Sequence, residues 1–214
     1  MAPRIPDTPL VIAGLGNPGS DYARNRHNAG FMAVDVIHDR HKFGPWKSRF
    51  QGLLADGELA GRKTYLLKPM TYMNESGISV GALVRFFKLP IESVVVFHDE
   101  LDLDAAKLKV KTGGGDAGHN GLRSITSVLG ANYRRVRMGV GHPGEKGRVH
   151  GHVLGNFSRA DEDWLVPILD GIAEAAPLLA KDDDVGFMNK VAVIANPPKK
   201  KTKPDEPGQT PKDA

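Results

Sequence analysis

Short apolar runs bounded by glycine or proline predict the strands of this chain. Residues 10–13 and 93–97 are rich in aliphatic and β-branched side chains without polar alternation, so we expect strands that are buried on both faces. Further strands are predicted at 49–56, 62–67, 107–111 and 134–140. The first two of these form a hairpin, with Gly57 and Gly61 in its turn. Glycine-rich loops are expected at 112–121 and 142–155.

Apolar residues at intervals of three and four predict the helices that connect these strands. The predicted helices span 29–41, 75–88, a short segment that follows the glycine-rich loop and ends at 129, a segment that begins near 160, and 185–195. Asn74 and Ser158 stand at N-cap positions, whereas Pro167 and Pro177 are expected to kink or interrupt the helix that contains them. Strands separated by helices, together with a hairpin, predict an α/β fold: a mixed sheet with helices on both faces.

The length and the apolar content predict one domain. The chain has 214 residues, of which 40% are hydrophobic, and this is enough for a sizeable core. We place that domain at 9–196, after a short N-terminal extension at 1–8. Lys, Pro and Asp dominate the tail at 197–214, which predicts disorder.

Composition narrows the class of protein. The chain has no Cys, which excludes disulfides, thiolate metal ligands and a cysteine nucleophile. Neither a leader sequence nor an apolar run of about 18 residues is found, so we expect a cytoplasmic protein with no membrane segment. The pI of 9.2 is no argument for nucleic acid by itself, because the tail holds 5 − 3 = +2 of the net charge of +4.

Two short motifs match known functional sequence patterns but lack the secondary structure that those patterns require. Gly14-Leu-Gly-Asn-Pro-Gly19 follows a strand like a dinucleotide fingerprint, but helical periodicity begins only near Ala29. Gly77-Ile-Ser-Val-Gly81 resembles a nucleophile elbow, yet Ser79 lies inside a helical pattern without a strand directly before it. We interpret the first as a glycine turn and Ser79 as a serine on a helix surface.

Polar residues gather where the two buried strands end. Asn17 and His27 follow the first strand, and His98-Asp99 follows the second. If these strands are neighbours, Asp99 can orient His27 as a general base that activates water. A metal site built from Asp99, Glu100, Asp102, His98 and His119 is the alternative, although no familiar ligand spacing appears.

Neutral amides and cations complete the candidate site. Asn17, Asn74 and Asn120 each stand in or beside a loop that follows a strand, where they could cap a turn or bind a peptide and an oxyanion. Lys109 and Lys111 share one face of a predicted strand, and Arg137 lies on the next. Such a row is either a solvated face or a groove for successive phosphates beside the glycine-rich loop.

With these stretches in hand, the chain resembles the bacterial peptidyl-tRNA hydrolase family over 10 to about 193. The matching motifs are Gly14-Leu-Gly-Asn-Pro-Gly19 with Tyr22, Arg26-His-Asn-Ala-Gly30, Lys68-Pro-Met-Thr-Tyr-Met-Asn-Glu-Ser-Gly77, His98-Asp-Glu-Leu-Asp102, Gly113-Gly-Gly-Asp-Ala-Gly-His-Asn-Gly121 and Arg137-Met-Gly-Val-Gly-His-Pro-Gly144. The family cleaves the ester that joins a peptide to its tRNA, so that the tRNA returns to translation.

The resemblance implies a role for each of these residues. His27 would be the catalytic base and Asp99 its orienting carboxylate, with Asn17, Tyr22, Asn74 and Asn120 binding substrate. Lys109, Lys111 and Arg137 would lie near the tRNA phosphates, and 149 to about 180 would carry a mobile cover. The resemblance thus implies a cytoplasmic monomer acting on peptidyl-tRNA, and we expect no metal and no cofactor; a non-catalytic RNA-binding module is the rival interpretation.

Two departures from the family pattern stand out. Asp104-Ala105-Ala106 replaces a stretch in which the family more often has Pro and Gly, so this turn is expected to differ. Asp116 adds an acid to the glycine-rich loop, where it would weaken the attraction of phosphate. Neither departure affects the expected catalytic residues.

Overall fold

A computed structural model describes residues 7–196 of the chain, which form a seven-stranded mixed sheet in the order β2-β3-β4-β1-β5-β7-β6. Its strands are β1 (Leu10–Gly14), β2 (Lys47–Arg49), β3 (Gly52–Leu59), β4 (Arg62–Pro69), β5 (Val94–Glu100), β6 (Leu108–Thr112) and β7 (Arg134–Gly139). The four strands β4, β1, β5 and β7 run parallel, and β3 and β6 flank them in antiparallel pairing. The carboxyl ends of the parallel strands therefore meet at one edge of the sheet.

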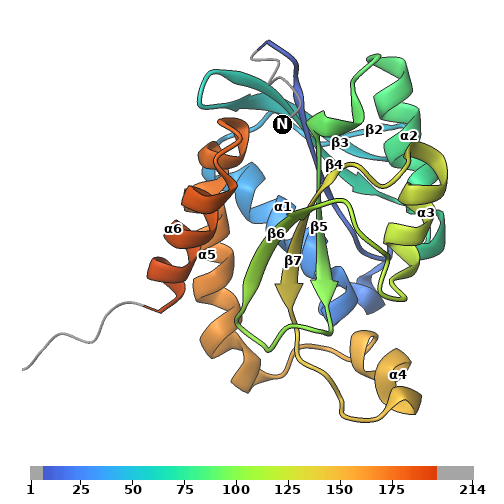
Figure 1. The fold of residues 1–214 in the computed structure, drawn as a ribbon, viewed down its shortest axis with the longest axis vertical. Helices are drawn as coiled ribbons and strands as arrows, with labels where there is room; N and C mark the ends of the chain where they lie inside the picture. Colours follow the sequence, from blue (N-terminus) through green and yellow to red (C-terminus); the bar gives the residue numbers. More distant parts are fainter. Residues whose placement is uncertain (1–6, 197–214) are drawn as a thin grey trace, which may run out of the picture.

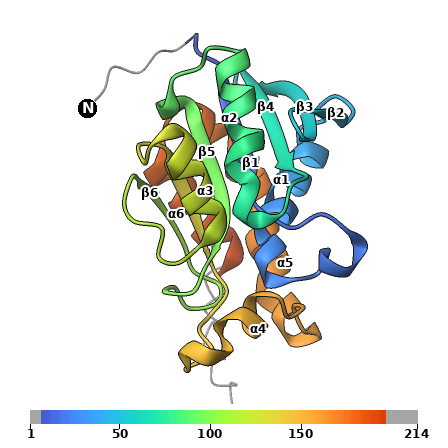
Figure 2. The same ribbon diagram turned by 90° about the vertical axis from the view of Figure 1, so that its right-hand side faces the viewer.

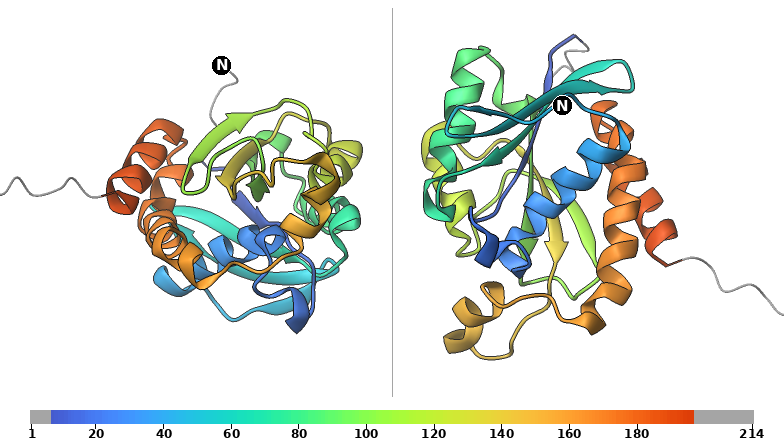
Figure 3. Two further views of the ribbon diagram at one scale, coloured as in Figure 1. Left: turned by 90° about the horizontal axis from the view of Figure 1, so that it is seen from below. Right: turned by 180° about the vertical axis from the view of Figure 1, so that it is seen from behind.

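Helices cover both faces of the sheet, as predicted (Figure 1, Figure 2). One face carries α1 (Ala29–Arg40), α5 (Glu162–Ala180) and α6 (Asp184–Ala195), and the other carries α2 (Ser76–Phe86) and α3 (Asn120–Leu129). The short α4 (Val149–Val153) lies beyond the strand ends (Figure 3). Single 3-10 turns complete the chain: η1 (Ser20–Tyr22), η2 (Arg26–Asn28), η3 (Met73–Glu75), η4 (Ile91–Ser93), η5 (Lys146–Arg148) and η6 (Arg159–Asp161).

The centre of the sheet is buried on both sides, as its continuous apolar runs predict. Every residue of β1 and β5 is buried, and alternate side chains enter the two separate cores. Helix α1 approaches this centre through glycines: a Cβ on Gly30 would lie 2.3 Å from the Phe97 carbonyl oxygen, and one on Gly14 would lie 2.2 Å from the Gly30 oxygen. This close approach places the start of α1 directly above the end of β1.

Several sequence predictions need correction. β5 continues through Glu100, because His98–Glu100 pair with Arg137–Gly139 of β7, so these polar residues end a strand rather than begin a loop. Gly57 lies within β3 and not in the hairpin turn. Asn74 is not an N-cap, because η3 leads into α2 and the position before that helix is Glu75, without a side-chain cap.

The region after β7 also differs from the prediction. Residues 142–155 are not all loop, since they contain η5 and α4. The predicted cover ends too late: α5 belongs to the core, so we reserve the term "cover" for residues 142–154. Ser158 does act as an N-cap: it forms a capping box with Asp161 at the start of η6, directly before α5.

Helix α5 is continuous through both of its prolines. Pro177 leaves the Ala173 carbonyl without its helical N–H, and His41 Nε2 donates to that oxygen at 2.7 Å instead. Of the two outcomes expected for these prolines, a kink or an interruption, the interruption is therefore wrong.

Two predicted segments fall partly or wholly outside the described residues. These are the tail at 197–214 and most of the extension at 1–8. Within the described part of the chain, none of the helices has the length and apolar character needed to cross a membrane.

Candidate active site

A cavity of about 740 Å³ opens at the edge where β1, β4 and β5 end. It is lined from five segments: the loop after β1, the turn after β4, the end of β5, the glycine-rich loop and the cover. The lining residues are Asn17, His27, Tyr72, Met73, Asn74, Asp99, Glu100, Leu101, Ala117, Gly118, His119, Asn120, Arg123, Val149, His150, Val153 and Leu154. The parallel centre of the sheet thus brings together most of the predicted site residues.

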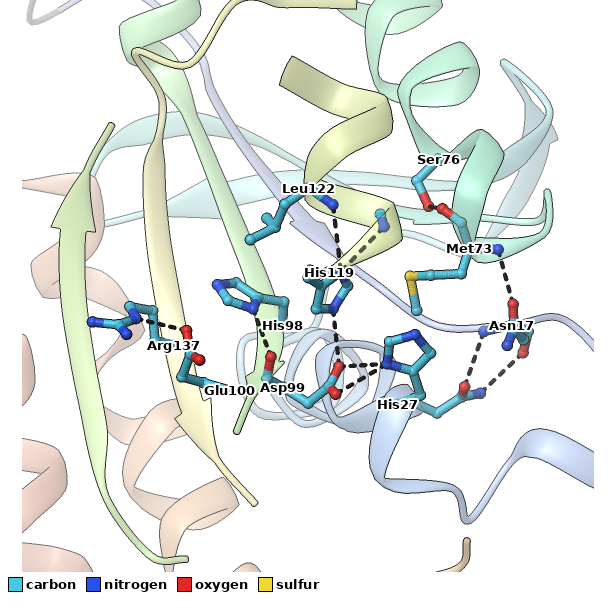
Figure 4. A network of polar contacts seen from close by, with 12 residues as sticks. Asn17, His27, Met73, Ser76, His98, Asp99, Glu100, His119, Leu122 and Arg137 are labelled. Atoms are coloured by element: carbon cyan, nitrogen blue, oxygen red, sulfur yellow. Dashed lines mark hydrogen bonds and ion pairs between the residues drawn. The ribbon is translucent and has the colours of Figure 1, made fainter. Parts of the chain in front are cut away.

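His27 and Asp99 form the hydrogen-bonded pair that the sequence predicts (Figure 4). His27 sits in η2, and its Nδ1 lies 2.8 and 3.0 Å from the two carboxylate oxygens of Asp99 on β5. An ionised carboxylate only accepts hydrogen bonds, so Nδ1 of His27 carries a proton and donates it. In the neutral ring, Nε2 is therefore the unprotonated nitrogen.

His119 donates to the same carboxylate from the other side. Its Nε2 lies 3.0 Å from Asp99 Oδ1, while its Nδ1 accepts from the backbone N–H groups of Gly121 and Leu122 as the N-cap of α3. These contacts fix the proton of His119 on Nε2. The sequence raised His119 as a metal ligand and left open whether it assists catalysis, and the hydrogen bond to Asp99 places it beside the His27–Asp99 pair.

The Asp99 carboxylate is held in its ionised form. Burial alone would raise the pKa of this carboxyl, but the charges and hydrogen bonds of His119 and His27 outweigh burial and hold the pKa well below its usual range. The side chain of Asp99 is 2% exposed. It therefore provides a fixed negative charge behind the His27 ring.

Asn17 is locked in one orientation (Figure 4). Its Oδ1 accepts from the Met73 backbone N–H at 2.8 Å, so its Nδ2 is left to act as a donor. The buried Asn28 side chain makes two bonds of 2.9 Å with the backbone N–H and carbonyl of Asn17. Asn28 is a site residue that the sequence analysis missed; its place directly after His27 was the available signal.

The other predicted amides also line the cavity. Asn74 belongs to η3 and Asn120 begins α3, where its Oδ1 accepts from Arg123 at 3.3 Å. Tyr22, by contrast, belongs to η1 and is not among the residues that line the cavity. The sequence also leaves open whether His142 assists catalysis; this residue is not among those that line the cavity, and its Nδ1 accepts from the Gly144 N–H at 3.0 Å.

The cluster of His27, Asp99 and His119 is the one group of potential metal ligands found among the described residues. Their candidate ligand atoms lie within 4.8 Å of one another. The other members of the predicted metal set, His98, Glu100 and Asp102, do not belong to this cluster. Glu100 pairs with Arg137 at 2.8 Å, and the His98 ring, although 5.1 Å from the ring of His119, directs its Nδ1 to the Asp99 carbonyl. A metal at this cluster would have to displace the imidazole protons that now hold Asp99.

The predicted basic residues lie beside a second cavity of about 300 Å³, under the glycine-rich loop. Lys111 and Arg137 line it, and Lys109 is the cross-strand neighbour of Arg137. Deeper in, the buried Arg135 donates to the Gly115 carbonyl at 2.6 Å. Glu100 lines both cavities, so the basic residues adjoin the active-site cavity without entering it.

Two buried groups in this second cavity have unpartnered atoms. The Nδ1 of His98 donates to the Asp99 carbonyl at 2.7 Å, while its Nε2 and the Nε and Nη2 of Arg135 have no hydrogen-bond partner among the described residues. Burial, with smaller contributions from His119 and Arg135, lowers the pKa of His98 to about 3. His98 is therefore a neutral acceptor at physiological pH.

The two rejected motifs behave largely as expected. Gly14 ends β1 and α1 begins only at Ala29, so the glycines form a turn and not a dinucleotide-binding helix start. Ser79 lies inside α2, which excludes a nucleophile elbow. It is fully buried, however, so its predicted place on the helix surface was wrong.

Comparison with known proteins agrees with this geometry. The model of the peptidyl-tRNA hydrolase family matches residues 11–203. Peptidyl-tRNA hydrolase from Acidiphilium cryptum is 61% identical over 182 residues, covering 85% of this chain and 95% of the relative. The protein of the same name from Granulibacter bethesdensis is 59% identical over 188 residues, covering 87% and 97%.

A solved structure shows the same fold. The crystal structure of peptidyl-tRNA hydrolase from Acinetobacter baumannii superposes with a TM-score of 0.81 at 41% identity, covering 86% of this chain and 94% of that one. The sequence motifs, the sheet that joins them and these matches agree over most of the chain. The chain belongs to the peptidyl-tRNA hydrolase family.

Proposed function

We propose that His27 and Asp99 carry out the reaction of this family, the hydrolysis of the ester that joins a peptide to its tRNA. The observation that carries this proposal is the Nδ1–H···Asp99 hydrogen bond of 2.8 Å, which leaves His27 Nε2 unprotonated at the cavity. A base of this kind needs no nucleophilic side chain, which fits a chain without Cys and with Ser79 inside a helix.

The reaction then proceeds in two proton transfers. His27 Nε2 takes a proton from a water molecule as the water oxygen attacks the ester carbonyl carbon. The imidazolium that forms is stabilised by the Asp99 carboxylate. When the tetrahedral intermediate collapses, the bond to the ribose oxygen breaks and His27 returns the proton to that oxygen, which gives a peptide acid and tRNA with a free hydroxyl.

The amides are proposed to bind the acyl group. The free Nδ2 of Asn17, and that of Asn120, are donors beside the base, suited to the carbonyl oxygen as it gains negative charge. Asn74 also lines this cavity and is proposed as a further contact of the substrate. Tyr22 lies outside the cavity lining, so we propose that it contacts a part of the substrate that extends beyond the cavity.

We propose that Lys109, Lys111 and Arg137 bind tRNA phosphates. Their positions on adjacent strands beside the glycine-rich loop support this role. Asp116 weakens the attraction less than expected, because its carboxylate accepts from Thr126 Oγ1 at 3.0 Å. It also lies 3.9 Å from Arg135, at the inner side of the loop.

All the proposed catalytic and binding residues come from one chain, which supports a monomer as the working unit. We further propose the cytoplasm as its compartment, because peptidyl-tRNA arises at the ribosome.

The test is release of labelled N-acetyl-amino acid from N-acetyl-aminoacyl-tRNA in the presence of EDTA, with unblocked aminoacyl-tRNA as the control substrate. We expect cleavage of the blocked substrate alone, and a loss of about 10²–10⁴ in kcat for a folded His27→Ala variant. Unchanged kcat in that variant refutes the mechanism. Activity that EDTA abolishes and added metal restores favours the His27, Asp99 and His119 metal site instead.

The phosphate contacts are tested by the salt dependence of KM. Lys111→Ala should raise KM for tRNA substrates and reduce the slope of log KM against log salt by about one. Lys63→Ala is the matched control, because Lys63 pairs with Asp56 on the β3–β4 hairpin. Equal effects of both variants contradict a phosphate groove at Lys111.

A further inference from the structure

The segment that leads into the His27 turn pairs with the residues that directly follow the cover. Residues 24–26 run antiparallel to 155–157, with backbone bonds from Arg26 N to Gly155 O at 3.0 Å and from Phe157 N to Arg24 O at 2.9 Å. Between them, the buried Asn25 donates from Nδ2 to Asn156 Oδ1 at 2.8 Å. His27 therefore follows directly after a segment that is paired with residues 155–157, which come directly after the cover.

The Arg26 side chain adds a second, stronger attachment. Its Nη1 donates to the Asn156 carbonyl and its Nη2 to Asp161 Oδ2, both at 2.9 Å, and its guanidinium lies 5.5 Å from the centre of the Phe157 ring. The Arg26 and Asp161 side chains are only 16% and 22% exposed. The pair is thus shielded from water, where charge-assisted bonds are strongest.

Asp161 is itself immobilised and charged. It accepts from the backbone N–H and hydroxyl of Ser158, and its other oxygen accepts from Trp164 Nε1 at 3.3 Å. Burial would raise the pKa of Asp161, but the bonds from Ser158, Trp164 and Arg26 lower it overall. Asp161 ends η6, which leads directly into the core helix α5.

We propose that Arg26 is a positioning residue for hydrolysis, which holds the η2 turn against the start of α5 and so places His27 Nε2 toward the ester. This inference rests on the proposed role of His27. Asp99 fixes the proton on the ring, whereas Arg26 fixes the backbone from which the ring extends. A misplacement of about 1 Å at a reacting group costs up to about 10²-fold in rate.

The experiment compares Arg26→Gln with Arg24→Gln. Both variants remove a guanidinium that links residues 24–26 to the start of α5. The Arg24–Glu162 pair, however, is solvent-exposed: 64% of the Arg24 side chain and 48% of the Glu162 side chain are accessible. We expect Arg26→Gln to lower kcat about 10- to 100-fold with KM within about threefold, and Arg24→Gln to leave both near the wild-type values. Arg26→Ala should regain activity with millimolar guanidinium chloride but not with sodium chloride at the same ionic strength.

Each outcome decides the inference. Loss of kcat in Arg26→Gln with guanidinium rescue of Arg26→Ala supports it, and equal kcat in the Arg26 and Arg24 variants overturns it. If Arg26→Gln lowers kcat only in proportion to the fraction unfolded, as measured by circular dichroism at the assay temperature, Arg26 is structural and the inference fails. His27→Ala is assayed beside these variants to test the proposed base separately. Full activity of His27→Ala refutes the role of His27 itself, whereas an inactive His27→Ala with a fully active Arg26→Gln refutes only the role of Arg26.

Discussion

Replacing Asp99 with Asn should place the proton of His27 on the wrong nitrogen. An amide offers one acceptor oxygen and one donor NH2 to two imidazoles that both donate to the carboxylate. His119 cannot change its tautomer, because its Nδ1 accepts from the Gly121 N–H. The amide oxygen therefore turns to His119 and the NH2 to His27, whose Nδ1 must accept and whose Nε2 then carries the proton.

The magnitude follows from the geometry of the pair. At the 2.8 Å that separates His27 Nδ1 from Asp99 Oδ1, attraction between the imidazolium and the carboxylate is worth about 6 kcal/mol at an effective dielectric constant of about 20. His119 shares the carboxylate and the amide dipole replaces part of the attraction, so about 4–5 kcal/mol should be lost. That corresponds to a decrease in kcat of about 10³–10⁴-fold.

The assay is single-turnover cleavage of N-acetyl-aminoacyl-tRNA at saturating enzyme, so that binding does not limit the rate. Asp102→Asn is the matched control, because it makes the same change of charge at an exposed carboxylate nearby. The tautomer is observed directly from the nitrogen-15 shifts of the His27 ring. A decrease in kcat of less than tenfold, or a proton still on Nδ1 in Asp99→Asn, contradicts the reasoning.

Three further predictions concern stability. In the folded protein His98 stays neutral down to about pH 3, whereas in the unfolded chain it takes a proton near pH 6.5. The free energy of unfolding should therefore fall as the pH drops below 6.5, by up to about 1.4 kcal/mol per pH unit. Urea unfolding at pH 7 and pH 5 should show a smaller fall in His98→Gln than in the wild type, and equal falls contradict this. Gly30→Ala should lower the free energy of unfolding by about 3 kcal/mol or more, because the new Cβ would lie 2.3 Å from backbone atoms. Gly151→Ala in α4 is the control: its Cβ would have no atom within 4 Å, so the melting temperature should stay the same or rise. Ala106 has φ 66°, so Ala106→Gly should stabilise by about 0.5 kcal/mol while Ala105→Gly destabilises, and a destabilised Ala106→Gly contradicts the assignment of strain.

The sequence predicts the central sheet and the base pair because both depend on local patterns. The apolar runs of β1 and β5 identify buried strands, and because the two strands are neighbours in the sheet, the polar residues at their ends converge. His27 and Asp99 could be paired in this way although they are 72 residues apart. The same logic predicted the amides at positions 17, 74 and 120, all of which line the cavity.

What sequence patterns missed depends on contacts between distant segments. His98–Glu100 of β5 pair with β7, and His41 donates to the Ala173 carbonyl that Pro177 leaves without its helical partner. The second partner of Asp99, His119, comes from a loop that returns across the sheet from β6. Local composition contains none of these pairings, so the prediction found the base and its carboxylate but not the groups that hold them.

The attachment of residues 24–26 to 155–161 also orders events during synthesis of the protein. His27 and Asp99 both leave the ribosome within the first half of the chain, but β7 and the Arg26–Asp161 contact follow much later. While it is being made, the chain is itself a peptidyl-tRNA, the kind of molecule that its family hydrolyses. A nascent chain that stops before residue 161 contains the base and its carboxylate but lacks the Asp161 partner of Arg26, so under the proposed role of Arg26 the hydrolysis of its own ester should be slowed until that contact forms.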